Sequence, residues 1–443
     1  MKEAVSFASG PSDSASKDNS VSSQGGRTSA PLNIFILHPS MILTNHRPSG
    51  DGLIAYEFIT RLARRGHQVH VAVSLQDIEG ELPPTLHLHD IHTKSTPSPF
   101  GAGLWNRIEF GLGAGALYRR LRKQIRFDVA HQFNPVVYGL CFFAAIRGVP
   151  LVMGPVPLSW PLGTEYANTL PRRLKKAVRS FMMSLQYRWA ARVLMATPPA
   201  HEGKSQNKGL PPGTTICSYG IDPEAFRPAS VQPSSTEPPT IMFLSNVWRR
   251  KGIFVLLDAF ERVQQKMPGA QLVIAGSGSE LDEVTERVKN HPAGQHIRLL
   301  GFVPREKVAA TLQTCSVFCL PSFGEPFGMA ALEAMSCGKP LVCTNSGGLA
   351  YLANPEGSIM VPPHDSTSLA DALVQVLADP AAAQRMGQAN RKYVLEKYSW
   401  DAIIDRLEGI YAGTLGSPVA ASVDLVSQDV WTSHDDRASE KKM

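Results

Sequence analysis

Glu325 and Glu333 have the clearest capacity for chemistry, because they stand eight residues apart around a predicted helix start that glycines open. They lie in the segment Phe323-Gly-Glu-Pro-Phe-Gly-Met-Ala-Ala-Leu-Glu-Ala-Met-Ser-Cys-Gly-Lys-Pro340. A helix N-terminus offers free N–H groups and a positive dipole end, which suit a phosphate. Ionised carboxylates only accept hydrogen bonds, so two of them suit a ligand rich in hydroxyls. A nucleotide sugar has both parts. The alternative is that Glu325 favours the helix dipole and Glu333 is solvated.

The segment resembles the Glu-x7-Glu motif of the retaining glycosyltransferases of family 4, also called the glycosyl transferases group 1 family. The resemblance extends over roughly residues 32 to 413 and is more specific in the C-terminal half. It implies a GT-B fold, an α/β architecture in which two Rossmann-like domains with doubly wound parallel sheets face a central cleft. Further matching stretches are Lys251-Gly252, Gly276-x-Gly278, Gly301-Phe-Val-Pro304, Leu341-Val-Cys-Thr-Asn-Ser-Gly-Gly348 and Tyr398-Ser-Trp400.

The resemblance implies a role for each charged residue that matches a family motif. Glu325 would contact hydroxyls of the donor sugar, and Glu333 would contact the nucleotide ribose. Lys251 stands where the family has a lysine that binds the diphosphate and stabilises it as it departs. The implied reaction retains the anomeric configuration, with the leaving diphosphate helping to deprotonate the acceptor, and it needs neither a metal nor another cofactor. A nucleotide-sugar epimerase and a non-catalytic nucleotide-sugar-binding protein stay as alternatives.

Backbone groups complete the implied donor site. The N–H groups of Phe327, Gly328 and Met329 would face the sugar and the phosphates. Backbone near Val303 would contact the nucleobase, which does not distinguish UDP from GDP or ADP. In the N-terminal domain, Gly50 of Ser49-Gly-Asp-Gly52 would approach the donor phosphates, where only glycine permits close contact.

Two positions depart from the family pattern. The family usually has an arginine where this chain has Asn246, so Arg249 or Arg250 is the candidate replacement at the diphosphate. Many members have a histidine near the reacting sugar, where this chain has Gly154-Pro-Val156. For the acceptor side the candidates are therefore His131 and Asn134, with a purely structural role as the alternative for His131.

The elements that must position these residues alternate between strand and helix. A predicted strand at 33–37, a glycine loop at 50–52, a helix at 54–65 and a strand at 69–73 open a Rossmann-like domain. A second alternation begins at 240–244, after a stretch rich in proline and serine. The predicted organisation is a disordered tail (1–31), an acceptor-side domain (32–227), a hinge linker (228–239), a nucleotide-sugar donor domain (240–413) whose last helix packs back toward the first domain, and a second disordered tail (414–443).

Charge is distributed unevenly along the 443 residues. Residues 1–227 hold 25 Lys and Arg against 15 Asp and Glu, and residues 228–443 hold 19 against 23. Basic residues gather in 119–126 and in 171–192, where apolar residues share one helical face. Such a helix can lie on an anionic membrane or pack on its own domain, and both interpretations stay open. Nucleic acid is not an expected partner, since aromatic residues are not interleaved with the basic ones.

The remaining composition predicts an ordinary globular protein. With 43% hydrophobic and 19% charged residues, and no apolar run of about 20 residues, the chain has no predicted membrane span or signal segment. We therefore expect a cytoplasmic protein, either free or peripheral on the inner membrane face. Its six cysteines show no Cys-x2-Cys pair and are expected to be buried thiols. Its thirteen histidines lack metal-ligand spacing, and no metal site is predicted.

Overall fold

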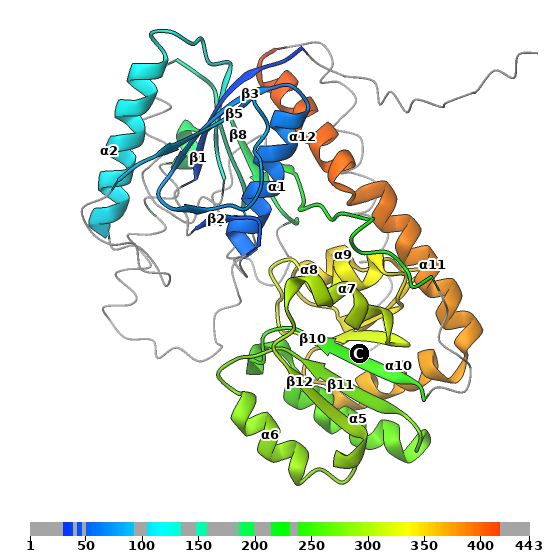
Figure 1. Ribbon diagram of the computed structural model, residues 1–443. Coiled ribbons are helices and arrows are strands. Elements are labelled where there is room, and N and C mark those ends of the chain that lie inside the picture. Colours follow the sequence, from blue (N-terminus) through cyan, green and yellow to red (C-terminus); the bar gives the residue numbers. More distant parts are fainter. Residues whose placement is uncertain are drawn as a thin grey trace, which may run out of the picture.

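The computed structural model describes residues 30–38, 42–46, 50–92, 104–133, 148–156, 181, 186–198, 214–230 and 238–416. These residues form two lobes, each built on a parallel sheet that is flanked by helices (Figure 1). No helix among them is long and apolar enough to cross a membrane. The two doubly wound parallel sheets that the sequence predicts are thereby confirmed.

The N-terminal sheet has seven strands in the order β5-β3-β1-β6-β7-β8-β9. The first strand lies inside the sheet, and the order reverses between β1 and β6, as in Rossmann-like domains. Apolar residues 34–37 are buried on both faces of β1, as a central parallel strand requires. The strands are β1 (Asn33–His38), β3 (Gln68–Val73), β5 (Leu86–Asp90), β6 (Val129–Gln132), β7 (Leu151–Val156), β8 (Arg192–Met195) and β9 (Thr214–Ile216), and a separate pair is β2 (Leu43–Thr44) with β4 (Gln76–Asp77).

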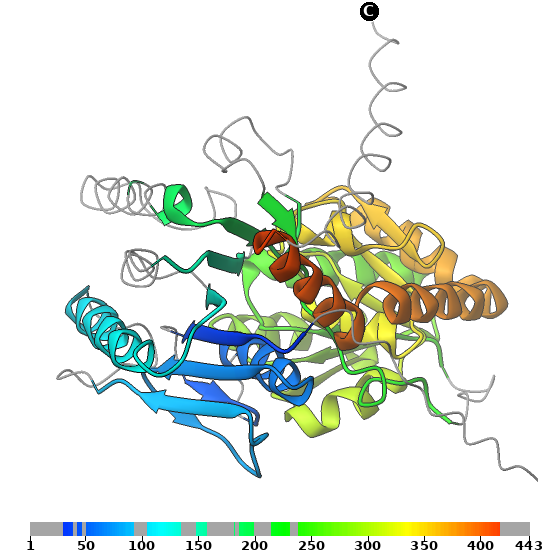
Figure 2. The same ribbon diagram turned by 90° about the horizontal axis from the view of Figure 1, so that it is seen from above.

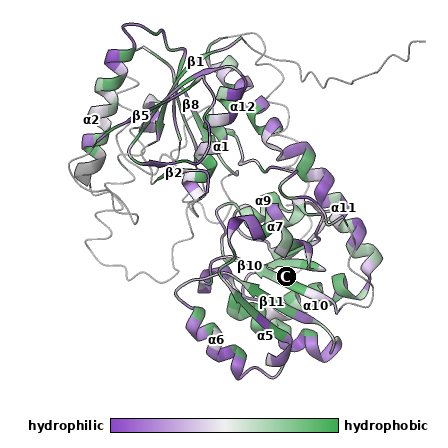
Figure 3. Ribbon diagram, in the orientation of Figure 1, coloured by the Kyte–Doolittle hydropathy of each residue, from purple (hydrophilic) through white to green (hydrophobic). Residues whose placement is uncertain are grey.

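The C-terminal sheet has six parallel strands in the order β12-β11-β10-β13-β14-β15. Its first strand, β10, pairs with β11 on one side and with β13 on the other, so the order reverses between β10 and β13. Figure 3 shows these strands as the hydrophobic centre of the lobe. The strands are β10 (Thr240–Leu244), β11 (Gln271–Ala275), β12 (Ile297–Gly301), β13 (Val317–Leu320), β14 (Leu341–Thr344) and β15 (Ser358–Val361).

Helices cover the sheets with apolar stripes. In α5 the buried residues recur at helical spacing, and Asp365 caps α10 by accepting hydrogen bonds from two backbone N–H groups. The helices of the N-terminal lobe include α1 (Gly50–Arg64) and α2 (Leu104–Leu121). Those that follow are η1 (Arg249–Lys251), α5 (Ile253–Lys266), α6 (Leu281–Lys289), η2 (Gly294–His296), α7 (Arg305–Gln313), α8 (Met329–Ser336), α9 (Gly348–Leu352), α10 (Ser366–Ala378), α11 (Pro380–Lys397) and α12 (Trp400–Thr414).

Helix α12 leaves the C-terminal lobe and packs on α1 of the N-terminal lobe, as Figures 1 and 2 show. The rings of Trp400 and Phe58 meet edge to face, 5.0 Å between centroids. At the α11–α12 junction, the backbone N–H of Ile221 donates to the Tyr398 carbonyl at 2.8 Å. The His67 ring lies 2.9 Å from Glu408, both side chains being buried. The last helix is therefore part of the core of the first lobe.

Some local predictions differ from the structure. Residues 50–52 were expected to form a loop but form the first turn of α1, where Asp51 favours the helix dipole and the small Gly52 is buried. The sequence did not predict α2. Its Gly113 allows close approach to the preceding segment, since a Cβ there would lie 2.5 Å from Ile91 Cγ2. Both errors come from treating glycine only as a helix breaker.

Several predictions fall wholly or partly outside the described residues. These are most of the basic segment 171–192, residues 231–237 of the predicted hinge, and nearly all of the two predicted tails. The five described cysteines are buried free thiols, as predicted, and burial raises the pKa of Cys343 to about 12. The sixth, Cys141, is not among the described residues.

Candidate functional site

Lys251 and Glu325 form an ion pair although 74 residues separate them in the sequence. Strands β10 and β13 are neighbours where the strand order reverses, so the loops that follow them leave the same edge of the sheet. Lys251 follows β10, and Glu325 follows β13. Their Nζ and Oε2 atoms are 2.6 Å apart, and the residues are only 8% and 6% exposed. The topology thus places two charged side chains where open α/β sheets bind their ligands.

Gly252 fixes the backbone next to Lys251. Its φ of 76° lies in the left-handed region, and a Cβ there would lie 1.9 Å from the Pro321 carbonyl oxygen. The two loops are also joined by hydrogen bonds, because Phe323 N and Ser322 Oγ both donate to the Arg250 carbonyl, at 2.8 and 3.1 Å. The position of Lys251 relative to Glu325 is therefore set by backbone contacts.

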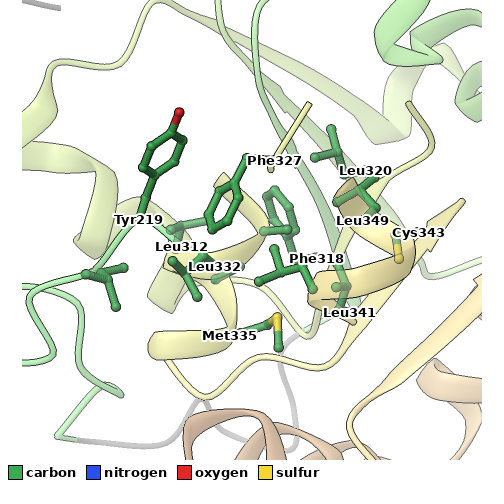
Figure 4. Packing of buried hydrophobic residues seen from close by; sticks show 14 of the residues in the cluster. Tyr219, Leu312, Phe318, Leu320, Phe327, Leu332, Met335, Leu341, Cys343 and Leu349 are labelled. Atoms are coloured by element: carbon green, nitrogen blue, oxygen red, sulfur yellow. The ribbon is translucent and has the colours of Figure 1, made fainter. Parts of the chain in front are cut away.

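Glycines also shape the loop that carries Glu325 into α8. Gly328, with a φ of 104°, immediately precedes the helix, and the N–H of Gly348 donates to the Glu325 carbonyl at 2.6 Å. A Cβ on Gly347 would lie 2.5 Å from the same oxygen. In Figure 4, Phe327 lies beside Tyr219, and their ring centroids are 4.9 Å apart. The start of α8, including the N–H of Met329, therefore sits on a rigid base with its first N–H groups outside the helical ladder.

Glu333 lies in the second turn of α8 and is paired with Arg305, the first residue of α7. Its carboxylate is buried, 5% exposed. Burial raises the pKa of Glu333, whereas the charge and the hydrogen bond of Arg305 oppose that rise. Both glutamates of the motif thus contact a cation, Lys251 for one and Arg305 for the other.

The two candidate arginines of the first loop have different surroundings. Arg249 pairs with Glu283 on the exposed side of the domain, and its guanidinium lies 4.5 Å from the Phe254 ring centroid. Arg250 is half-buried, lies 4.2 Å above the Trp248 ring, and its carbonyl joins the Glu325 loop. Arg250 is therefore the better placed of the two, and its predicted contact with a diphosphate stays a prediction.

The other predicted donor residues lie at the same edge of the sheet or on the opposite lobe. Asn246 is exposed just after β10, and Val303 is half-buried just after β12. Gly50 is exposed at the N-terminus of α1, with no atom within 4 Å of the place where a Cβ would stand. Among the described residues, Thr197 of the N-terminal lobe reaches the site loop directly, its Oγ1 lying 3.5 Å from the Pro326 carbonyl oxygen.

Of the two acceptor-side candidates, His131 is among the described residues. His131 is fully buried, with Nδ1 near the Tyr411 hydroxyl and Nε2 2.9 Å from the Gly154 carbonyl, and burial lowers its pKa to about 3. These contacts give His131 a structural role, because they join β6, β7 and α12. Asn134 is outside the described residues.

Sequence reasoning missed Arg305 and His364, whose ring stacks on Phe323 at 3.7 Å between centroids, and it gave the matching Gly347-Gly348 no role. Arg305 directly follows the Gly301-Phe-Val-Pro304 motif, and that adjacency was the signal available. The contact itself joins two helices and is not visible in the sequence.

The arrangement offers cations and a helix N-terminus to an anion, and carboxylates to hydroxyl groups. Among the residues that the structure describes, no group of three or more His, Cys, Asp or Glu side chains is arranged to hold a metal ion. Within the described ranges, Lys251, Arg250 and Arg305 bring positive charge to the site, and Glu325 and Glu333 bring negative charge. A diphosphate attached to hydroxyl-bearing sugars is the ligand with matching chemistry.

Two family models match consecutive parts of the chain. The model of glycosyltransferase family 4 matches residues 49–225, and that of glycosyl transferases group 1 matches residues 228–393. The chain is 28% identical to the phosphatidyl-myo-inositol mannosyltransferase of Mycobacterium leprae over 342 residues, 74% of this chain and 84% of that protein. It is 32% identical to a glycogen synthase of Mycobacterium tuberculosis over 198 residues, 44% of this chain, and so spans about half (48%) of that relative's length.

Solved structures share the two-lobed architecture. Sucrose-phosphate synthase from Thermosynechococcus elongatus superposes with a TM-score of 0.67 at 20% identity, covering 87% of this chain and 99% of that one. HepE of Anabaena, in a complex with UDP and glucose, gives a TM-score of 0.63 at 16% identity, covering 86% and 100%. At such identities the likeness concerns the fold, and the family models carry the assignment. The chain therefore belongs to the glycosyl transferases group 1 family, glycosyltransferase family 4, and has the GT-B fold.

Proposed function

We propose that the protein is a retaining hexosyltransferase that moves a sugar from a nucleotide-diphosphate sugar to a hydroxyl acceptor. The observation that carries the proposal is the buried pair of Lys251 and Glu325, 2.6 Å apart at the carboxyl edge of the C-terminal sheet. Family membership supports the reaction class. A relative named as a mannosyltransferase and a structural neighbour in complex with UDP and glucose support a hexose donor.

Each charged side chain would have a separate task in the reaction. The Lys251 ammonium would neutralise charge that develops on the departing diphosphate, and the Glu325 carboxylate would accept hydrogen bonds from the donor sugar. Arg250 would add a second cation at the diphosphate, and Glu333 would hold the ribose. Retention would follow if a diphosphate oxygen deprotonates the acceptor on the face that the leaving group vacates. The protein would then contribute positioning and charge stabilisation.

For the acceptor we propose a lipid-linked or cell-surface glycan precursor at a membrane face. The excess of basic over acidic residues in 1–227 supports an anionic surface as partner. Phe181 and Trp189, described residues of the basic segment, are 67% and 42% exposed. Helix α2 also exposes Ile108 and Leu112, one turn apart, before its basic end. Exposed apolar side chains beside basic ones are typical of helices that lie on lipid. The relative from Mycobacterium leprae is named for transfer to phosphatidyl-myo-inositol.

Transfer activity is tested with UDP-glucose and GDP-mannose as donors and vesicles containing phosphatidylinositol as acceptor. We expect Lys251→Met and Glu325→Gln each to lower kcat by about a hundredfold or more, since each removes an interaction with the reacting groups. The matched control is Lys289→Met, on the exposed face of α6, where the lysine forms an ion pair with Glu286. It should leave kcat unchanged.

The outcomes also separate the alternatives. Consumption of the donor without acceptor, with a new nucleotide sugar as product, would identify an epimerase. Nucleotide binding with no turnover of any donor would identify a non-catalytic binding protein. Configuration at the product's anomeric carbon, measured by proton NMR, decides retention.

Membrane association is measured by co-sedimentation with vesicles that contain about 30% anionic lipid. Each basic residue near such a surface contributes about 1 kcal/mol to the binding free energy. Replacing four of them with neutral residues should therefore abolish binding at physiological salt. The test variant replaces Arg172, Arg173, Lys175 and Lys176 with Gln. The control variant makes the same change at the exposed residues Lys289, Arg298, Lys307 and Lys397 of the C-terminal lobe. Equal loss of binding in both variants, or none in the first, contradicts a role for this segment.

A further inference from the structure

Arg305 is the charged neighbour of Glu333 that the family motif does not contain. Its Nη1 donates to Oε1 of Glu333. The Glu333 side chain is 6% exposed, whereas the Arg305 side chain is 45% exposed. The guanidinium is therefore the solvent-facing member of the pair, and a ligand that reaches the carboxylate meets the guanidinium as well.

The Phe226 ring holds the guanidinium from the other side. Its centroid lies 4.7 Å from Cζ of Arg305, and the ring is buried. Phe226 is itself fixed, because its carbonyl accepts hydrogen bonds from Ser336 Oγ at 2.6 Å and from Arg391 Nη1 at 2.7 Å. Ser336 is on the same helix as Glu333, so this hydrogen bond attaches Phe226, whose ring contacts Arg305, to the helix that carries the carboxylate.

We propose that Arg305 is a positioning residue for the nucleotide ribose: its guanidinium, held against Phe226, fixes the Glu333 carboxylate as the acceptor for both ribose hydroxyls. This inference rests on the proposed function and extends it. It assigns to a residue outside the family motif the selection of ribonucleotide over deoxyribonucleotide donors.

The reason lies in what a buried carboxyl group can accept. An ionised carboxylate has four acceptor positions, so one bond from Arg305 leaves room for two hydroxyl donors, whereas a protonated carboxyl must spend one oxygen as a donor. Burial favours the protonated form, and the adjacent guanidinium favours the ionised one. Among the described residues, the thiol of Cys337, the C-cap of α8, also interacts electrostatically with Glu333; its pKa is raised to about 12, so it stays neutral.

The experiment measures dissociation constants by calorimetry for UDP, GDP and their 2′-deoxy forms between about pH 6 and pH 8.5. The unaltered protein should bind the ribonucleotide about tenfold more tightly than the deoxy form, because losing one hydrogen bond to a charged group has about that effect. This ratio of dissociation constants should be the same over the whole pH range. In Arg305→Met the Glu333 carboxyl is expected to protonate at higher pH. The ratio should fall to near one at pH 6 and recover toward the alkaline end.

Two further variants make the result specific. Arg305→Lys keeps the charge but loses the planar fork, so it should keep the flat pH profile with a reduced ratio. Lys307→Met removes an exposed charge two residues along α7 and should behave as the unaltered protein. If Arg305→Met shows the same ratio of deoxyribonucleotide to ribonucleotide dissociation constants as the unaltered protein at every pH, the inference about Arg305 is overturned, while the proposed function still stands. If the unaltered protein binds no nucleoside diphosphate, the proposed function is overturned and the inference falls with it.

Discussion

Two glutamates of one motif occupy different electrostatic surroundings in this protein. Glu325 pairs with a lysine of the neighbouring loop, and Glu333 pairs with an arginine that lies at the rim of the site. A lysine offers a compact point charge, which suits a diphosphate, while an arginine offers a fixed fork, which suits a carboxylate. The two carboxylates of the motif therefore differ in the kind of cation that each one contacts.

Acid should weaken the attachment of α12 through Glu408. Burial alone would raise the pKa of Glu408, but hydrogen bonds and charges from His67 and Arg65 outweigh burial and hold the pKa below its usual value. A carboxyl whose pKa is lower in the folded state adds stability above its unfolded pKa and loses that contribution as pH falls through the folded pKa. Between about pH 5 and pH 3 the free energy of unfolding should therefore fall, and Glu408→Gln should remove part of that fall.

Urea unfolding at pH 7 and pH 3.5 measures this effect. Glu408→Gln should be less stable than the unaltered protein at pH 7 and close to it at pH 3.5. The control is Glu396→Gln, an exposed position on α11. If the free energy of unfolding falls by the same amount between pH 7 and pH 3.5 in Glu408→Gln and in the unaltered protein, a group other than Glu408 causes the loss of stability in acid.

At the scale of elements, the site is made by two loops that leave adjacent strands. The strand predicted at 240–244 coincides with β10, because a short apolar run that follows a stretch rich in proline and serine has the length and the flanking residues of a buried strand. The alternation of strand and helix that begins there also fixes the edge at which Lys251 and Glu325 meet. The start of α1 and the whole of α2 were harder to predict, since both contain glycine inside a helix, and Gly113 of α2 permits a close approach to Ile91. Arg305 could not be predicted because its partner depends on how α7 packs against α8.

Gly252 lies between η1 and α5, and its substitution should disturb the site strongly. In Gly252→Ala the methyl group would meet the Pro321 carbonyl while the residue is held at a positive φ. We expect a loss of at least about 1–3 kcal/mol in the free energy of unfolding and a lower affinity for nucleoside diphosphates, because Lys251 must shift with its backbone.

Gly269→Ala is the matched control for this change. Gly269 lies in a turn of the same domain with open space around it, so alanine there should be neutral or stabilising by about 0.4–1 kcal/mol. Thermal unfolding with and without nucleotide measures both variants. Equal stability of the two variants would contradict the assigned strain.

At the scale of the whole molecule, the two lobes are joined through α12, in addition to the chain that runs between them. The predictable part is the existence of two similar domains, which the repeated strand and helix pattern reveals. The contacts that join them could not be predicted, because Trp400 meets Phe58 across 342 positions of the chain and no local pattern marks that pairing.

Trp400→Ala should therefore destabilise the N-terminal lobe, although Trp400 comes late in the sequence. Replacing a buried tryptophan by alanine costs about 3–5 kcal/mol. Native-state hydrogen exchange should show loss of protection in β1 and β6, with little change in β10 and β13. Leu395→Ala, at an exposed position of α11, is the control and should leave both sheets protected. Loss of protection confined to the C-terminal sheet would contradict the assignment of Trp400 to the first lobe.

The return of α12 to the first lobe has a consequence during synthesis of the protein. During synthesis β1 emerges from the ribosome long before Trp400 and Tyr411. The first lobe therefore cannot complete its core until α12 has been made, whereas the second lobe can fold once its own strands have emerged. Until then the α1 surface that receives Trp400 is open to solvent and to chaperones. Anyone who cuts this chain into separate domains should therefore attach residues 400–414 to the N-terminal fragment, since that fragment alone has an unfilled place in its core.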